Sequence, residues 1–236
     1  MKHFSNENID NIARIDRWQK GRQKAFKAIP STGKTFKYLG KEFLLYPGTF
    51  WPFVDSQPLV RNFRIKPEDS VLDIGTGSGV IAIFACYQGA SKVLAVDINP
   101  SAIKSAKHNA KLHGFDKIMQ VKNSDLFQKI KDIQFDVITA NLPFRNKFAH
   151  DVVAQSQWDT DFKTNARFFE EVGHYLKPNG RIYFAQSNFG GVQEMKVLAK
   201  AAGFSVRAIG SAAADQEETK KFFAFVMKRI AARKPT

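Results

Sequence analysis

Residues 71–83, with the sequence VLDIGTGSGVIAI, constrain the fold of this chain more than any other segment. A strand-type apolar run leads into three glycines spaced by two (Gly75, Gly77 and Gly79), and an apolar helical run follows. Because glycine has no Cβ, the backbone can turn tightly and a ligand can approach the strand end and the helix N-terminus. The segment therefore predicts a strand–turn–helix unit that holds a nucleotide-like cofactor. The alternative is a tight turn without a ligand.

About twenty residues later, a second apolar run ends in Asp97, within the sequence KVLAVDINP. In a doubly wound sheet, an acidic residue at the end of the second strand holds ribose hydroxyls. A dinucleotide-dependent oxidoreductase and an S-adenosylmethionine (SAM) enzyme both fit this pattern. The dinucleotide fingerprint requires Gly-x-Gly-x-x-Gly, whereas here the third glycine comes one residue early and position 80 is valine. The glycine spacing therefore favours a SAM enzyme.

Four motifs in sequence order resemble those of the class I SAM-dependent methyltransferases. They are residues 73–79 (DIGTGSG), 95–100 (AVDINP), 123–127 (NSDLF) and 141–144 (NLPF). The last is similar to the Asn-Pro-Pro-Phe/Tyr signature of enzymes that methylate planar nitrogens. The pattern as a whole most resembles the HemK-like, small-domain N-methyltransferases, over roughly residues 45–190.

The resemblance implies a role for each motif residue. Asp73 would meet the amino end of the methionine moiety, Asp97 the ribose hydroxyls and Asp125 the adenine amino group, while Ile98 and Leu126 would sandwich the adenine ring. The residues expected to bind SAM are Asp73, Gly75, Thr76, Gly77, Gly79, Asp97, Ile98, Asp125, Leu126 and Asn141.

The residues expected to be catalytic are Asn141, Leu142, Pro143 and Phe144. The Asn141 side-chain oxygen and the Leu142 carbonyl can accept hydrogen bonds from a planar nitrogen, and Phe144 can stack on the acceptor group. Leu142 stands where the signature has its first proline. An Asn-Leu-Pro-aromatic sequence also occurs in the ribosomal RNA adenine dimethylases, so an RNA acceptor stays open. The alternative for this motif is an ordinary turn at the end of a strand.

Strands and helices alternate from Val71 onward, which predicts an α/β fold with a parallel sheet and helices on both faces. The expected architecture is a doubly wound, mainly parallel, seven-stranded Rossmann-like sheet with a terminal antiparallel hairpin. Strands are expected near 71–75, 92–98, 117–123, 135–141, 181–187, 204–211 and 221–229. Residues 1–46 are expected to form a basic N-terminal helix (7–29) and a hairpin, and residues 47–236 the methyltransferase domain.

The net charge is +14, and residues 11–41 hold nine lysines or arginines against one acidic residue. This balance favours a polyanionic partner such as RNA or a ribosomal surface. Residues 7–41 form a basic arm, for which a soluble basic surface and a lid over a small-molecule site are the alternatives. Residues 145–161, which follow the catalytic motif, are expected to overhang the acceptor site.

The favoured function is SAM-dependent N-methylation of a protein glutamine-type amide or of a ribosome-associated protein. An RNA base amino group is the first alternative, and a non-catalytic adaptor that binds RNA or the ribosome is the second. The single cysteine, Cys86, excludes an intrachain disulfide, and no apolar run approaches the length of a membrane span. These features indicate a cytoplasmic protein without a membrane partner. The five histidines show no ligand spacing, so no metal is expected.

Overall fold

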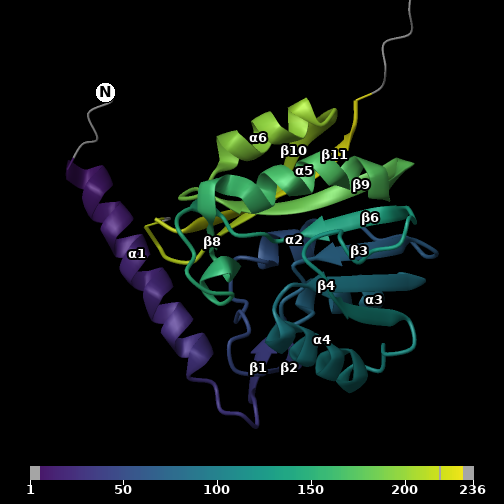
Figure 1. Ribbon diagram of the computed structural model, residues 1–236, viewed down its shortest axis with the longest axis horizontal. Coiled ribbons are helices and arrows are strands. Elements are labelled where there is room, and N and C mark those ends of the chain that lie inside the picture. The colour runs from purple at the N-terminus through teal and green to yellow at the C-terminus, as the bar shows by residue number, and fades with distance from the viewer. Residues whose placement is uncertain (1–5, 218, 231–236) are drawn as a thin grey trace, which may run out of the picture.

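The computed structural model describes residues 6–217 and 219–230. Its centre is a seven-stranded sheet in the order β10-β11-β9-β6-β3-β4-β5, and Figure 1 shows helices on both sides of it. The strands are β3 (Ser70–Ile74), β4 (Lys92–Asp97), β5 (Met119–Asn123), β6 (Phe135–Ala140), β9 (Leu176–Ser187), β10 (Phe204–Ala213) and β11 (Lys221–Arg229). β3, β4, β5, β6 and β9 pair in parallel, whereas β11 is antiparallel to both β9 and β10. The expected doubly wound fold with a terminal antiparallel hairpin is confirmed.

Successive residues of the central strands point to opposite faces of the sheet, and each face has its own hydrophobic core. Val71, Val93 and Val137 pack with α2 (Gln57–Asn62), α3 (Val80–Tyr87) and α4 (Pro100–Leu112). Leu72, Leu94 and Ile138 pack with α5 (Lys163–Tyr175) and α6 (Val192–Ala201). Burial on both faces explains why the central strands are apolar almost throughout. Within the described residues, no helix has the length and apolar character of a membrane span.

The start of β9 differs from the sequence prediction. The sequence predicts a helix that carries Phe168, Phe169, Val172 and Leu176 and is stopped by the KPNG segment (177–180). In the structure the helix ends at Tyr175, and the strand begins at Leu176 rather than near residue 181. Leu176 pairs with Phe135 and Arg181 pairs with Val137, so the register shifts across the intervening KPNG segment. The KPNG segment was expected to end the helix and lie outside the strand, but it belongs to β9. It interrupts the pairing register, while the backbone stays extended along β6.

The N-terminal elements are α1 (Asn6–Lys27) and the hairpin of β1 (Lys34–Tyr38) and β2 (Lys41–Leu45). Leu39 and Gly40 turn the hairpin with φ angles of 47° and 79°. The hairpin is fixed to α4, because the Asn109 side chain accepts a hydrogen bond from the Leu44 N–H (2.8 Å) and donates one to the Leu44 carbonyl (2.9 Å). In Figure 1, α1 lies beside the sheet near β8 (Trp158–Asp159). The division into two domains at residue 46 stays a prediction.

The segment after the catalytic motif forms small elements rather than a featureless loop. β7 (Arg145–Asn146) pairs in parallel with β8, and short 3-10 helices cover Ala154–Ser156 and Thr160–Phe162. These elements hold residues 145–161 beside the carboxyl end of β6.

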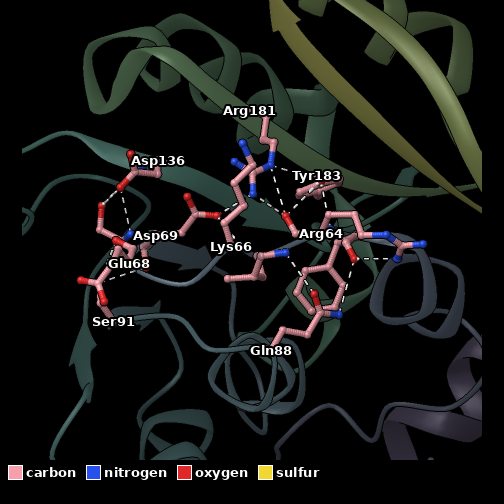
Figure 2. A network of polar contacts seen from close by, with 12 residues as sticks. Arg64, Lys66, Glu68, Asp69, Gln88, Ser91, Asp136, Arg181 and Tyr183 are labelled. Carbon is pink, nitrogen blue, oxygen red and sulfur yellow. Dashed lines mark hydrogen bonds and ion pairs between the residues drawn. The ribbon is translucent and has the colours of Figure 1, made fainter.

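A polar network fixes the opposite, amino-terminal end of the sheet (Figure 2). Arg181 donates to Asp69 (2.6 Å), and Asp136 accepts from the Ser70 N–H (2.9 Å) and from Lys177 (2.8 Å). Partial burial alone would raise the pKa of Asp136, but the bonds from Lys177 and Ser70 outweigh it and lower that pKa to about 2. The network thus ties β3, β6 and β9 together at the end of the sheet remote from the glycine turn.

Candidate active site

The glycine turn follows β3 and leads into α3. Gly75, Gly77 and Gly79 have φ angles of 70°, 55° and 83°, which side chains disfavour. A Cβ on Gly79 would lie 3.2 Å from the Ala106 Cα, and a Cβ on Gly75 would lie 3.2 Å from Leu142 Cδ2. The glycines therefore serve both the backbone conformation and the close approach of neighbouring elements, and they leave an open cradle at the strand end.

Asp97 ends β4 and braces this cradle. Its carboxylate accepts hydrogen bonds from the Gly77 N–H and the Asn99 N–H, both at 2.8 Å. Burial raises the pKa of Asp97, and the backbone hydrogen bonds oppose that shift. The side chain also lines the cavity described below. Each carboxylate oxygen has a second lone pair, so Asp97 can still accept from ligand hydroxyls.

Asp73 lies behind the turn, fully buried and outside the cavity lining. Its Oδ1 accepts a hydrogen bond from Thr139 Oγ1 (2.6 Å), whereas the buried Oδ2 has no partner among the described residues. Burial raises the pKa of this carboxyl to about 6. An unpartnered buried carboxylate oxygen beside the cradle suits a cationic or N–H group, so the expected contact with the amino end of SAM stays a prediction.

We expect Asp73→Asn to raise the melting temperature at pH 7.5 by about 5 °C. The folded state holds the Asp73 proton more tightly than the unfolded chain does, so the ionised carboxylate lowers stability above pH 6 and costs less as the pH falls. Asparagine can still accept from Thr139. The gain should therefore shrink at pH 4.5 in thermal denaturation, and exposed Asp116→Asn should show no such change. A loss of stability at pH 7.5 would contradict this account.

The residues expected around an adenine ring lie together at the carboxyl ends of β4 and β5. Ile98 is 46% exposed, Leu126 is buried with a φ of 47°, and both line the cavity with Asp125. Asp125 Oδ2 accepts a hydrogen bond from Arg167 Nη1 (2.9 Å). Arg167, on α5, also lines the cavity. Arg167 was not predicted from the sequence, because only the fold brings α5 to this strand end.

Asn141 follows β6, and a buried carboxylate fixes the orientation of its amide. Asn141 Nδ2 donates to Asp55 Oδ2 (2.7 Å) and lies 3.2 Å from Ser56 Oγ, which can accept a second bond. Because an aspartate carboxylate only accepts hydrogen bonds, the amide nitrogen must face Asp55 and the oxygen must face away. Asn141 Oδ1 is buried and has no partner among the described residues. Asp55 and Ser56 were not predicted as site residues. They end the aromatic segment of residues 46–56 (YPGTFWPFVDS), and the only sequence signal was an acidic residue and a hydroxyl residue in that segment.

The backbone carbonyls of residues 142–144 in the NLPF motif differ in which donors they accept from. The Pro143 carbonyl accepts from Asn165 Nδ2 (3.0 Å), and the Phe144 carbonyl accepts from the Gly191 N–H (2.9 Å). The Leu142 carbonyl accepts no hydrogen bond within the described part of the chain. The motif loop is thus held on both sides of Leu142, and the Leu142 carbonyl and Asn141 Oδ1 remain available as acceptors.

One cavity of about 340 Å3 joins these groups. The glycine turn, Asp97 and Asp125 line it together with Asn141 and Phe144, as expected for two loops that face each other at adjacent strand ends. Its walls also include the overhanging segment around Trp158 and the inner face of α1. Trp18 and Gln19 of α1 belong to this wall. The cradle of glycines and the Asp97 carboxylate fit SAM, and the unpartnered Asn141 oxygen fits a hydrogen-bond-donating acceptor.

Sequence comparisons place the chain among methyltransferases. The family of ribosomal protein L11 methyltransferases (PrmA) matches residues 59–154. The chain is 34% identical over 174 residues to a putative protein N5-glutamine methyltransferase of Methanocaldococcus jannaschii, an alignment that covers 71% of this chain and 86% of that protein. It is 34% identical to the ribosomal protein L11 methyltransferase of Caldicellulosiruptor bescii and 30% identical to the release factor glutamine methyltransferase of Fusobacterium nucleatum. These two alignments cover 60% and 63% of this chain but 43% and 47% of the two relatives, so the chain spans less than half of their length.

Solved structures support the fold. A ribosomal protein L11 methylase from Lactobacillus delbrueckii subsp. bulgaricus matches with a TM-score of 0.60 at 23% identity, over 78% of this chain and 83% of that chain. TYW2 of M. jannaschii in complex with AdoMet (SAM) matches with a TM-score of 0.56 at 19% identity, over 85% and 88%. With the motifs on the expected strand ends, the chain belongs to the class I SAM-dependent methyltransferases, in the group that includes the protein N5-glutamine methyltransferases.

Proposed function

We propose that this enzyme transfers a methyl group from SAM to the nitrogen of a planar amide in a protein, with a glutamine side chain as the favoured acceptor. The observation that carries the proposal is the fixed orientation of Asn141. Asp55 and Ser56 hold its Nδ2, which leaves Oδ1 buried, unpartnered and on a residue of the cavity wall. A preorganised acceptor of this kind suits an N–H group of the substrate.

Bound SAM would supply an electrophilic methyl group and leave as S-adenosylhomocysteine. The methylated nitrogen would then lose one proton to solvent. We assign Asp97 to the ribose hydroxyls, Asp125 to the adenine amino group, Ile98 and Leu126 to the faces of the adenine ring, and Asp73 to the amino end. Each assignment matches the hydrogen-bonding capacity of its side chain, since ionised carboxylates only accept.

An amide nitrogen is a poor nucleophile, because its lone pair is delocalised over the planar group. Hydrogen bonds from its N–H bonds to Asn141 Oδ1 and to the Leu142 carbonyl would favour a localised lone pair and stabilise the positive charge that develops on nitrogen. Phe144, 8% exposed and packed against Phe189 and Phe222, would exclude water from the acceptor. Positioning supplies much of the remaining rate enhancement.

We infer a protein of the translation apparatus as the partner. The relatives are named for a ribosomal protein and a release factor, both of which are protein acceptors. The chain covers less than half of those relatives, so it need not share their means of recognising a substrate.

An RNA base amino group is the second candidate. The outward face of α1 exposes Arg17, Lys20 and Lys24, none of which forms an ion pair within the described residues. The whole chain has a net charge of +14, and the exposed lysines and arginine on this face suit phosphate groups. A base amino group is also planar and would use the same Asn141 and Leu142 acceptors.

Labelling separates the two candidates. We expect radiolabelled SAM, the enzyme and a lysate of the source organism to give label that resists ribonuclease and is lost on protease treatment. Mass spectrometry should place one added methyl group on a glutamine amide nitrogen. Label that resists protease and is lost to ribonuclease would favour the RNA candidate. Label on carbon or on a hydroxyl oxygen would contradict methylation of a planar nitrogen.

A further inference from the structure

Gln19 of α1 is a buried polar residue in the wall of the active-site cavity. It is 1% exposed, and the cavity lining includes it together with Asn141 and Phe144. The motifs that place SAM and the catalytic loop do not use it. A buried amide in a catalytic cavity needs partners for both its oxygen and its nitrogen, because an unpaired buried polar group costs free energy.

The partners of the Gln19 oxygen fix the orientation of the amide. Gln19 Oε1 accepts hydrogen bonds from Trp158 Nε1 (2.8 Å) and Arg145 Nη1 (3.0 Å). Indole and guanidinium groups only donate, so the oxygen and nitrogen of this amide cannot be exchanged. Both lone pairs of Oε1 are then used. Gln19 Nε2 forms no hydrogen bond with any described residue. Its two N–H donors are therefore unpartnered, on a residue that lines the cavity.

The helix is anchored firmly enough to hold this donor in place. Asp16, one turn before Gln19, pairs with Arg145 and Lys147, which directly follow the catalytic motif. Arg22, one turn after, donates to the Trp51 carbonyl, and its guanidinium lies 4.0 Å from the Phe53 ring centroid. These contacts fix α1 to the catalytic loop and to the aromatic segment on either side of Gln19.

Two residues of the cavity lining thus carry unpartnered amide groups of opposite polarity. Asn141 offers an oxygen, and Gln19 offers an NH2 group. The cavity lining also includes the contacting rings of Trp18, Phe53, Phe144, Phe189 and Phe222. A carboxamide has the complementary pattern, because its N–H groups donate and its carbonyl accepts. A tetrahedral amine lacks the carbonyl.

We propose that Gln19 is a specificity-determining residue whose Nε2 donates a hydrogen bond to the carbonyl oxygen of the acceptor carboxamide. The inference rests on the proposed function and extends it: α1 completes the acceptor site, and the substrate amide is held between Asn141 and Gln19. A site that satisfies a substrate carbonyl discriminates against acceptors without one, since the buried donor would then be left unpaired.

The test uses the full chain saturated with S-adenosylhomocysteine, and N-acetylglutamine N-methylamide as the probe. We expect the probe to bind to the unaltered enzyme in an NMR titration, and its Kd to rise at least about 10-fold in Gln19→Glu. Glutamate can still accept from Trp158 and Arg145, but it directs an acceptor instead of a donor at the probe carbonyl. Gln19→Met removes the donor without adding charge, and it should also raise the Kd of the probe. Exposed Gln120→Glu on β5 carries the same change of charge and should leave the Kd within about twofold.

The Kd for S-adenosylhomocysteine serves as the folding control and should stay the same in all variants. A probe Kd in Gln19→Glu and Gln19→Met within about twofold of the unaltered value would overturn the inference, as would failure of the probe to bind up to about 50 mM. Adenosine binding that depends on Gln19, without probe binding, would assign the donor to a base instead. If the Gln19 variants bind normally while the lysate label lies on glutamine, the inference fails and the proposed function stands. Absence of glutamine label overturns the proposed function itself.

Discussion

Asn141→Ala is expected to lower kcat by about 100- to 1000-fold while the Kd for SAM changes by less than about threefold. The bond to Asn141 Oδ1 strengthens only as positive charge develops on the acceptor nitrogen, so its loss raises the barrier more than it weakens ground-state binding. Single-turnover kinetics with the labelled acceptor would give the rate, and calorimetric titration the SAM affinity.

Asn179→Ala provides the matched control, because Asn179 is exposed in the KPNG segment and lines no part of the cavity. It should leave kcat and the SAM affinity unchanged. Asp55→Asn should lower kcat as well, since it replaces an obligate acceptor with a group that can rotate and release Asn141 Nδ2. Full activity in Asn141→Ala would contradict the catalytic role of Asn141 and with it the proposed function.

Asp97→Ala is expected to weaken SAM binding by at least about 100-fold. The substitution removes the acceptor assigned to the ribose hydroxyls. It also releases the Gly77 and Asn99 N–H groups, so the glycine turn loses its brace. Calorimetric titration at pH 7.5 measures the affinity directly.

Exposed Asp116→Ala makes the same change of charge away from the cavity and should bind SAM normally. Asp97→Asn separates the two roles. Its amide retains one acceptor oxygen but directs a donor at a backbone N–H, so it should also bind weakly. SAM affinity in Asp97→Ala within threefold of the unaltered value would refute the assigned position of the ribose.

Local sequence was sufficient for the sheet and for the glycine turn after β3. The three closely spaced glycines predict a tight turn without reference to any distant residue. Their positive φ angles are disfavoured for residues with a side chain. The parallel topology then places Asp97 and Asn141 at the same edge of the sheet, since the carboxyl ends of parallel strands coincide. Motifs on adjacent strand ends therefore predicted the cavity between them.

Some predictions from sequence need amendment or stay open. β9 begins at Leu176, because extended backbone continues along β6 through a register shift that periodicity does not reveal. The basic arm was expected to engage RNA, with a lid as the alternative. The inner face of α1 lines the cavity, whereas Arg17, Lys20 and Lys24 point outward. One helix can serve both roles, and the RNA contact stays a prediction.

By itself the sequence determined the α/β class and the methyltransferase motifs, including the loop of residues 141–144, because each rests on residues close together in the chain. Only the tertiary structure decided what holds and completes that loop. Asn141 and Asp55 are 86 residues apart, Asp125 and Arg167 are 42 apart, and Gln19 and Trp158 are 139 apart. Each pair joins side chains from different elements, and the direction of an amide depends on which donors and acceptors the packing brings to it. No local pattern carries that information.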